Sequence, residues 1–384
     1  SDDPDAVGVR ALEDTVLTVD LEQPAGYFLH LLALPVAFPV PRHLVGQHGA
    51  AWADPACIVT NGPFSLVSWE RGESLVLVRY PHYHGRFAGN VQQVKIFFMP
   101  DIATSRDIQM YEAGLVDAVS VISPGWEEKG FLHKHAGEFV LGPAAETVYL
   151  AFPVGQAPFD DPRLRRAFAH ATNREALPDV TQRVYASPAL GGFVPPGIPG
   201  HVPEIALPYD PERARQLLAE AGYPGGKGFP PVDWLTNPWS QARSENLQAQ
   251  WRETLGLETR WRIMEWEDLS ALLDPDPPAP FILPWLADWP DPDSFLRVGI
   301  TRRAPAWRHG TYMALVDRAG RAMDQTQRMG LYAQAERILA DQVPILPLSY
   351  TGWPTLLKPW VKQFPVTVTG QDFWKDVVIE PHGS

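Results

Sequence analysis

Apolar and polar residues alternate in short stretches along this chain, and a stretch of that kind predicts a half-buried β-strand. Residues 15–21 read TVLTVDL, and the apolar run over residues 28–34 is typical of a short helix. Residues 64–69 and 74–80 both alternate, and the polar stretch between them contains Gly72. The two alternating stretches therefore predict a β-hairpin.

The residues after the hairpin predict a crossover connection. Residues 91–99 are strand-like, and residues 101–114 have apolar contacts at helical spacing with Asp101 as the expected N-cap. Residues 116–121 are strand-like again. A strand, a helix and a second strand in this order favour an α/β lobe.

Helical spacing of apolar residues is more frequent in the second half of the chain. Residues 162–177 predict a helix that Asp160 or Asp161 can cap, and residues 210–221 predict a helix with Asp210 as its N-cap. Further helices are expected over residues 247–255, 312–324 and 328–340, and further extended segments over residues 258–264, 353–358 and 376–379.

Length and charge limit the classes of protein to consider. A chain of 384 residues is too long for one core of ordinary size, so two or three lobes are expected. No apolar run reaches the roughly 18 residues that a membrane span needs. The net charge of −13 opposes binding to a phosphate backbone, so nucleic acid is not an expected partner. Cys57 is the only cysteine, which excludes an intrachain disulfide and a cysteine-based zinc site.

The sequence lacks the usual motifs for nucleophilic catalysis and metal binding. It has no Gly-x-Ser-x-Gly elbow. The pairs His82/His84 and His133/His135 have no accompanying third ligand, so both pairs are interpreted as solvent-exposed loop histidines. We therefore expect no catalytic residue, no metal site and no cofactor.

Two tryptophans bracket one carboxylate in the segment 284–293, which reads PWLADWPDPD and is expected to form a proline-stiffened turn. Rings that exclude water around a fixed anion make a receptor for an ammonium group, through ion pairing and cation–π attraction. In that interpretation Asp288 binds the amine, and Trp285 and Trp289 form the walls. In the other interpretation both rings belong to the core and Asp288 caps a turn. The residues alone leave both interpretations open.

Six motifs also occur in a fixed order along the chain. They are TNGPF at 60–64 with Trp69, Gly72 and Tyr83; PFDDPRLR at 158–165; Asn173-Arg174; GFVPPG at 192–197; YDPERARQLLAEAGY at 209–223; and Asp324, Arg328, Tyr332, Ala335 and Glu336. In this order they resemble the family 5 extracellular solute-binding proteins of ABC transporters, the group that binds oligopeptides, dipeptides and nickel.

The resemblance implies a type II periplasmic-binding-protein fold, in which a hinge joins two α/β lobes. Family members have a substantial region before the strand expected at residues 15–21, so the N-terminal part of the fold is expected to be missing. The expected divisions are residues 1–55 as the remnant of an N-terminal subdomain, residues 56–164 plus 352–384 as lobe I, and residues 165–351 as lobe II, with hinge crossings near Phe159 and Tyr350.

The segment Trp285-Leu286-Ala287-Asp288 is similar to the family motif GW.ADYPDP. In peptide-binding members the aspartate of this motif holds the α-amino group of the peptide, which assigns that role to Asp288. Trp285 and Trp289 are then expected to wall the pocket, and Tyr149 and Tyr350 are further expected lining residues. Pro284 departs from the motif, because the family usually has glycine there.

The function implied by the resemblance is capture of a small peptide or related amine-bearing solute between two closing lobes. The solute would then pass to the membrane permease of an ABC importer. The protein is expected to be a non-catalytic monomer in the periplasm or outside the cell, with a lipid signal upstream as a means of anchoring. Two other classes stay open: the ligand-sensing C-terminal domain of a larger regulatory protein and, less favoured, a hydrolase.

Overall fold

The computed structural model describes residues 7–99, 106–120, 129–177, 185–273 and 276–382. The chain forms two compact units. Unit 1 contains residues 1–37, 149–173 and 189–347, and unit 2 contains residues 38–148, 174–188 and 348–384. Two long strands, β7 (Phe139–Ala151) and β12 (Ile345–Leu357), pass from one unit into the other. The lobe boundaries expected from the sequence differ from these divisions and stay a prediction.

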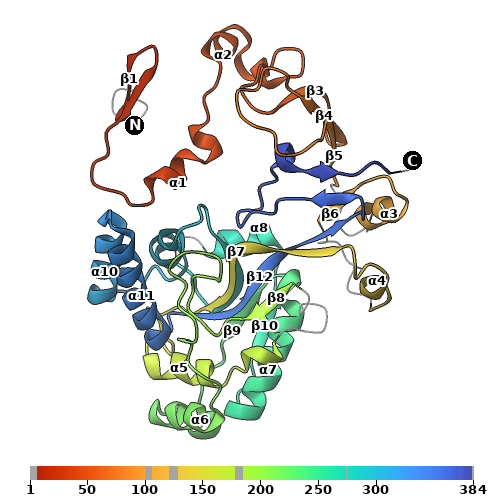
Figure 1. Ribbon diagram of the computed structural model, residues 1–384. Helices are drawn as coiled ribbons and strands as arrows, with labels where there is room; N and C mark the ends of the chain where they lie inside the picture. The colour runs from red at the N-terminus through yellow and green to blue at the C-terminus, as the bar shows by residue number, and fades with distance from the viewer. Residues whose placement is uncertain (1–6, 100–105, 121–128, 178–184, 274–275, 383–384) are drawn as a thin grey trace. The chain divides into compact units, whose positions relative to one another are not determined.

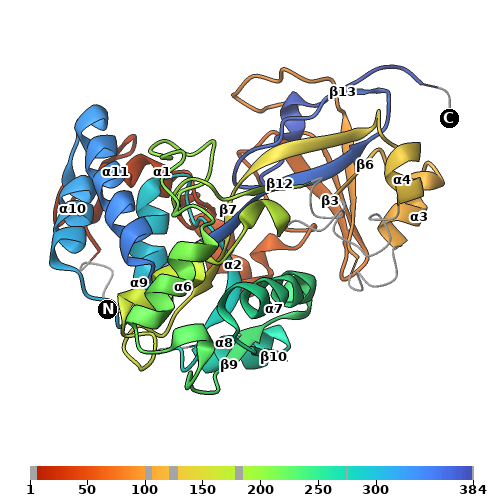
Figure 2. The same ribbon diagram turned by 90° about the horizontal axis from the view of Figure 1, so that it is seen from below.

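Unit 1 is built on strands in the order β10-β9-β11-β7. Strands β10 (Arg260–Ile263) and β11 (Phe281–Leu286) both run parallel to β9 (Asp233–Thr236). Helices α7 (Gln241–Leu255) and α8 (Trp266–Leu273) connect the three strands along the chain. Figure 2 shows both helices near β9 and β10. This arrangement of strands and crossover helices is the expected α/β architecture.

The core of unit 1 beneath β9 is aromatic. Trp234 and Trp251 are 1% and 0% exposed, and their ring centroids lie 4.8 Å apart. Phe168 packs on both, at 5.2 and 4.9 Å. The indole N–H of Trp251 donates to the hydroxyl of Thr172 at 3.1 Å. Trp234 and Trp251 are thus large core residues, and the indole nitrogen of Trp251 has a partner.

The capped helices of unit 1 form where their N-caps predict. Asp161 accepts a hydrogen bond from the Arg163 N–H at the start of α5 (Pro162–His170), and Asp210 accepts from the Arg213 N–H in α6 (Pro211–Glu220). The helix expected over 162–177 is shorter than predicted. It ends at His170, and the Thr172 hydroxyl donates to the carbonyl of Phe168 in the last turn.

The last two helices of unit 1, α10 (Gly310–Arg321) and α11 (Gln325–Gln342), lie side by side in both views (Figures 1 and 2). Unit 1 also contains the first described segment of the chain. There β1 (Val9–Glu13) pairs antiparallel with β2 (Val16–Val19), and α1 (Phe28–Leu32) follows. The strand and helix predicted in this segment are confirmed, and β1 was not predicted because residues 9–13 do not alternate.

Unit 2 contains the predicted hairpin. Strands β3 (Phe64–Glu70), β4 (Ser74–Arg79) and β5 (Gln93–Phe97) form an antiparallel sheet in that order, with Gly72 at a φ of 80° in the turn between β3 and β4. The positive φ explains why a glycine occupies this turn.

The remaining elements of unit 2 include the predicted helix and strand after the hairpin. They are α2 (Arg42–His48), α3 (Arg106–Glu112), β6 (Ala118–Ser120), α4 (Lys129–Lys134), β8 (Ala186–Pro188), β13 (Val361–Gln363) and β14 (Val378–Ile379). Ile108 and Tyr111 of α3 pack on Leu356 of β12 and form a small core. Asp101, the expected N-cap of this helix, lies outside the described residues.

Candidate functional site

Asp288 lies just beyond the end of β11, in unit 1, with its side chain exposed. Its backbone N–H donates to the hydroxyl of Ser294 at 3.0 Å, which fixes the turn of the chain. Among the described residues, none forms a hydrogen bond or an ion pair with the Asp288 carboxylate. Asp288 therefore presents an unpaired carboxylate to solvent from a fixed backbone.

Asp291, three residues further on, anchors this turn to α11. Its two carboxylate oxygens accept hydrogen bonds from the two terminal nitrogens of Arg328, at 2.7 and 2.6 Å. The side chains are 3% and 1% exposed. Burial alone would lower the pKa of Arg328, but the hydrogen bonds and the charge of Asp291 outweigh burial and raise that pKa. A bidentate, desolvated pair of this kind holds one geometry.

Asp293 makes a second anchor. It is fully buried, it pairs with Arg297 one turn later, and it accepts a hydrogen bond from the Tyr332 hydroxyl at 3.1 Å. Burial and the neighbouring Asp293 carboxylate raise the pKa of Tyr332, so the hydroxyl stays protonated and donates. Both aspartates of the Asp-Pro-Asp sequence are thus internal, whereas Asp288 faces solvent.

Trp289 is held from the N-terminal segment. The ring of Tyr27 stacks on it with centroids 5.6 Å apart and planes 22° apart, and the Tyr27 hydroxyl accepts a hydrogen bond from Arg297 at 3.2 Å. Gly26 allows the approach, since a Cβ at this position would lie 2.8 Å from Nε of Arg328. The half-buried Trp289 is therefore fixed beside Asp288 by residues far away in the sequence.

Trp285 is 4% exposed and belongs to strand β11, which corrects the expectation that the whole segment 284–293 is a turn. The strand forms because Phe281, Ile282 and Leu283 are completely buried beside β9, and this burial outweighs the turn preference of Pro284. The Trp285 ring packs so closely on Gly299 that a Cβ there would lie 3.2 Å from Cε2 of the indole.

The two expected tyrosines lie in different units. Tyr149 of unit 1 is 0% exposed, and its ring centroid lies 5.4 Å from that of Phe193, which also touches Gly299. Tyr350 is 5% exposed and stands in β12 opposite Ser187 of β8, within unit 2. Asp288, Trp285, Trp289 and Tyr149 are therefore residues of one compact unit, and their roles in ligand binding stay predictions.

The sequence pattern assigns no role to Asp291 or Asp293, although both belong to the segment 284–293. Arg328 and Tyr332 belong to a motif, but the motif does not indicate their partners. The close spacing of Asp291 and Asp293 could have indicated two cationic partners. Two aspartates with a single proline between them need such partners when both are buried.

A further buried carboxylate shapes the loop 192–197. Glu336 of α11 is 0% exposed and accepts hydrogen bonds from the N–H groups of Phe193 and Val194 at 2.9 and 2.7 Å. Burial raises the pKa of Glu336 to about 7, although these two hydrogen bonds oppose the rise. Gly192 is required here, since a Cβ would lie 2.1 Å from a Glu336 oxygen.

The histidine pairs do not form metal sites in the part of the chain that the structure describes, where no group of three or more histidine, cysteine or acidic side chains could hold a metal ion. The interpretation of His135 as a solvent-exposed histidine is wrong. It is 7% exposed, because its two ring nitrogens face carboxylates of Glu138 and Glu112 at 2.7 and 3.3 Å.

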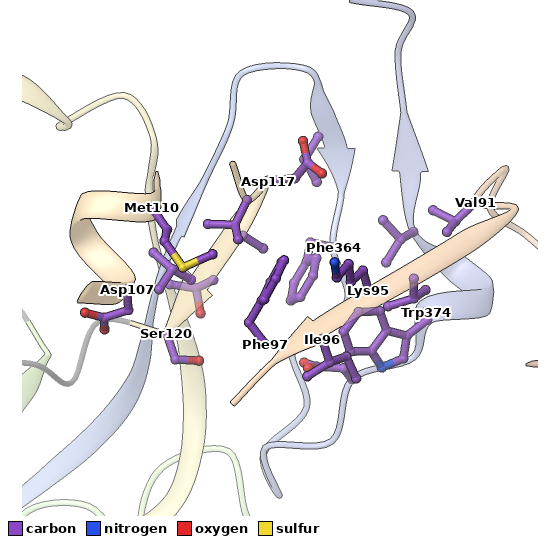
Figure 3. A pocket seen from close by; sticks show the side chains of 18 of the residues that line it. Val91, Lys95, Ile96, Phe97, Asp107, Met110, Asp117, Ser120, Phe364 and Trp374 are labelled. Atoms are coloured by element: carbon purple, nitrogen blue, oxygen red, sulfur yellow. The ribbon is translucent and has the colours of Figure 1, made fainter. Parts of the chain in front are cut away.

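Unit 2 contains a cavity of about 760 Å³. Consecutive residues of β5 and β6 line it, so the cavity runs along the edges of these two strands rather than over one face. Figure 3 shows Phe97 and Phe364 in its middle, with Met110 and Asp107 of α3 to one side and Trp374 to the other. Its lining is mainly apolar, and none of the five expected site residues belongs to it.

The carboxylate of Asp117 at this cavity already accepts a hydrogen bond from the Trp360 indole at 2.7 Å. Asp107 and Asp372 also line this cavity. The Asp107 carboxylate accepts a hydrogen bond from the backbone N–H of the next residue, and burial raises the pKa of Asp372, which favours its uncharged form. The exposed Asp288, unpaired among the described residues, is therefore the better receptor for an amine. Within the described residues, no helix has the length and apolar character needed to cross a membrane.

Comparisons of this chain with a family model and with known proteins agree on one family. Residues 1–301 match the model of the bacterial extracellular solute-binding proteins, family 5 middle region. The chain is 31% identical to the probable deoxycholate-binding periplasmic protein YgiS of Escherichia coli, across 99% of this chain and 72% of the relative. It is 29% identical to the periplasmic oligopeptide-binding protein OppA of Salmonella typhimurium, across 95% and 68%.

Solved structures show the same relationship. The unliganded open form of the murein tripeptide-binding protein MppA is similar with a TM-score of 0.82 and 25% identity, across 99% of this chain and 75% of that one. The type II periplasmic-binding-protein fold expected from the sequence is thereby confirmed.

Proposed function

This chain belongs to the bacterial extracellular solute-binding proteins of family 5, and we propose that it captures a small peptide or a related amine-bearing solute for an ABC importer. The observation that carries the proposal is the state of Asp288. Its carboxylate is exposed and has no ion-pair partner among the described residues, whereas its neighbours Asp291 and Asp293 are buried in ion pairs.

A fixed, unpaired carboxylate is suited to an ammonium group. The ion pairs of Asp291 and Asp293, just after Asp288, hold the backbone of the loop, so little conformational entropy is lost when a ligand binds. Trp289 stands directly beside Asp288, and its stacking on Tyr27 prevents rotation of the ring. An ammonium group placed here gains an ion pair and a cation–π contact in a partly dry environment.

The names of the relatives support a peptide as the solute. OppA of Salmonella typhimurium is an oligopeptide-binding protein, DppE of Bacillus subtilis a dipeptide-binding protein, and MppA of Escherichia coli a murein peptide-binding protein. YgiS carries the description deoxycholate-binding, so the family also accepts solutes without an amine. We choose the amine-bearing class because of Asp288.

The proposed protein binds its solute and does not convert it. The two units would act as lobes that close on the solute, with Tyr350 contributing from the second lobe and Trp285 and Tyr149 from the first. The closed protein would then deliver the solute to a membrane permease. We propose an extracytoplasmic monomer, attached to the membrane where a lipid signal precedes it, that has no catalytic activity and does not bind nucleic acid.

The test is calorimetry with a set of unmodified tripeptides, followed by mass spectrometry of the recovered peptide. The proposal predicts saturable binding with one site per chain and recovery of the intact peptide after prolonged incubation. Absence of binding to every tripeptide contradicts the peptide assignment, and cleavage of the peptide contradicts the non-catalytic one.

A further inference from the structure

Among the described residues, nine buried side-chain polar atoms of unit 1 have no hydrogen-bond partner. Three of them belong to residues that lie close together: the hydroxyl of Tyr149, Nε1 of Trp285 and Nε of Arg303. None of the three residues has a carboxylate partner in the described part of the chain, and the Arg303 guanidinium makes a side-chain contact with the Tyr149 hydroxyl. A buried donor without a partner costs about 1–3 kcal/mol, so three such groups close together require an explanation.

The three groups belong to one cluster. The guanidinium carbon of Arg303 lies 5.7 Å from the centre of the Trp285 ring. Burial raises the pKa of Tyr149, and both the charge of Arg303 and its side-chain contact with the hydroxyl oppose that rise. Phe193 links the two aromatic residues, since its ring lies 5.4 Å from Tyr149 and touches the same Gly299 as Trp285.

The backbone that carries Arg303 is built to bring it to Trp285. Ser294–Gly299 forms a π-helix directly after the Asp288 turn, and α9 (Ile300–Arg303) continues it. Gly299 and Arg303 are four residues apart, so both face the same side of this helix. Gly299 lets the Trp285 ring approach the backbone, and Arg303 then extends over that ring.

The hydrogen-bonding groups of the cluster indicate which chemical group of a ligand it would bind. The Trp285 and Arg303 nitrogens can only donate, and the Tyr149 hydroxyl can donate as well. Arg303 is half-buried and has no carboxylate partner among the described residues. Two or three donors around one uncompensated guanidinium match a planar anion with several acceptor positions, which is a carboxylate.

We propose that Arg303, with Tyr149 and Trp285, forms a subsite for a carboxylate group of the bound solute. The inference rests on the proposed function, because it places this subsite in the same unit as the amine-binding Asp288. Trp285 and Asp288 are three residues apart, so their Cα atoms are separated by no more than about 10 Å. The solute class is therefore a compact zwitterion, such as a short peptide with both termini free.

The experiment uses trialanine in four forms: unmodified, N-acetylated, C-amidated, and blocked at both ends. Affinities are measured by calorimetry for the wild type, Arg303→Gln, Asp288→Asn and the control Arg302→Gln, which changes an exposed arginine of the same helix. Thermal melts establish that each variant is folded.

The wild type and Arg302→Gln are expected to prefer the free carboxylate over the amide by at least about tenfold. Arg303→Gln should abolish this preference and keep the preference for a free amine. Asp288→Asn should lose the preference for a free amine and keep the preference for a free carboxylate. The carboxylate result can therefore be interpreted even if the assignment of the amine to Asp288 fails. If Arg303→Gln keeps the full preference for the free carboxylate, then ordered water alone satisfies these donors and the proposal is overturned.

If no form of trialanine binds, the proposed peptide function fails, and the subsite is tested with deoxycholate, a carboxylate without an amine. A loss of at least about tenfold in deoxycholate affinity for Arg303→Gln, with Arg302→Gln unchanged, supports the subsite. Equal affinity of both variants, or no deoxycholate binding by the wild type, overturns it.

Discussion

Arg328 donates from both terminal nitrogens to the two oxygens of Asp291, and less than one twentieth of either side chain is exposed. The pair spans 37 residues of sequence and ties the loop after β11 to helix α11. It fixes the backbone on which Asp288 stands three residues earlier. The candidate site is thus a surface charge supported by an internal ion pair.

Removing one partner of this pair should destabilise the protein strongly. In Arg328→Met the Asp291 carboxylate stays buried without a counter-ion, which costs about 3–5 kcal/mol. Urea unfolding followed by circular dichroism measures the loss. Replacing both residues, as in Asp291→Leu with Arg328→Met, should recover much of it because no charge stays buried.

The matched control is Arg321→Gln, which removes an exposed pair with Asp317 in the neighbouring helix α10. Exposed pairs contribute about 0–1 kcal/mol, so this variant should unfold almost as the wild type does. Equal losses in Arg328→Met and Arg321→Gln would show that the buried pair does not anchor the loop.

Gly26→Ala should weaken the contact between the N-terminal segment and the site. The new Cβ would lie 2.7 Å from the Ala322 carbonyl oxygen and 2.8 Å from Nε of Arg328, so one of these groups has to move. We expect a lower melting temperature and a weaker Asp291–Arg328 pair. Gly330→Ala is the control. It fills open space within α11 and should raise stability by up to about 1 kcal/mol, so a fall in its melting temperature argues against this account.

Glu336 should make stability depend on pH near neutrality. Its pKa is about 7 in the folded protein, above the ordinary value of 4.5. Between these two values the folded state holds a proton that the unfolded state releases, so this contribution to stability is largest at low pH and is lost as the pH rises through about 7. Glu336→Gln should flatten the difference in unfolding free energy between pH 6 and pH 8. An unchanged pH dependence in this variant would contradict the raised pKa.

Tyr27 should affect ligand affinity through Trp289, although we do not expect it to touch the ligand. Tyr27→Ala removes the stacking partner of Trp289 and should weaken peptide binding by roughly two- to tenfold, the range that an aromatic pair contributes. Tyr27→Phe keeps the ring and should bind within about twofold of the wild type. Tyr209→Ala, a change at an exposed tyrosine of the same unit, serves as the control in the calorimetry. Full affinity in Tyr27→Ala would exclude the positioning role.

The sequence predicted those parts of the fold that depend on local signals. The hairpin of β3 and β4 has its turn glycine within the predicted segment, and α5 and α6 have their capping aspartates directly before them. Strands β7 and β11 were missed for a physical reason. Most of β11, and of β7 beyond Leu141, is buried, so these strands show no alternation, and β11 contains Pro284.

The site shows the same division. Asp288 and its two tryptophans were found because they are neighbours in the sequence. The partners that hold them come from Tyr27, Arg297 and Arg328, and only the folded chain brings these residues together. No feature of the sequence marks Arg303 as a binding residue. Its proposed role follows from its position beside the buried polar atoms of Trp285 and Tyr149, which only the folded chain shows.

The central claim is that the Asp288 carboxylate binds the amino group of the solute, and one affinity ratio tests it most directly. Calorimetry gives the affinity of an unmodified tripeptide relative to its N-acetylated form, for the wild type, Asp288→Asn and the control Asp268→Asn, which changes an exposed aspartate of α8. We predict a ratio of about 10 to 100 in the wild type and in Asp268→Asn, and a ratio near one in Asp288→Asn. A wild-type ratio near one, or a ratio that Asp288→Asn leaves unchanged, would contradict the account.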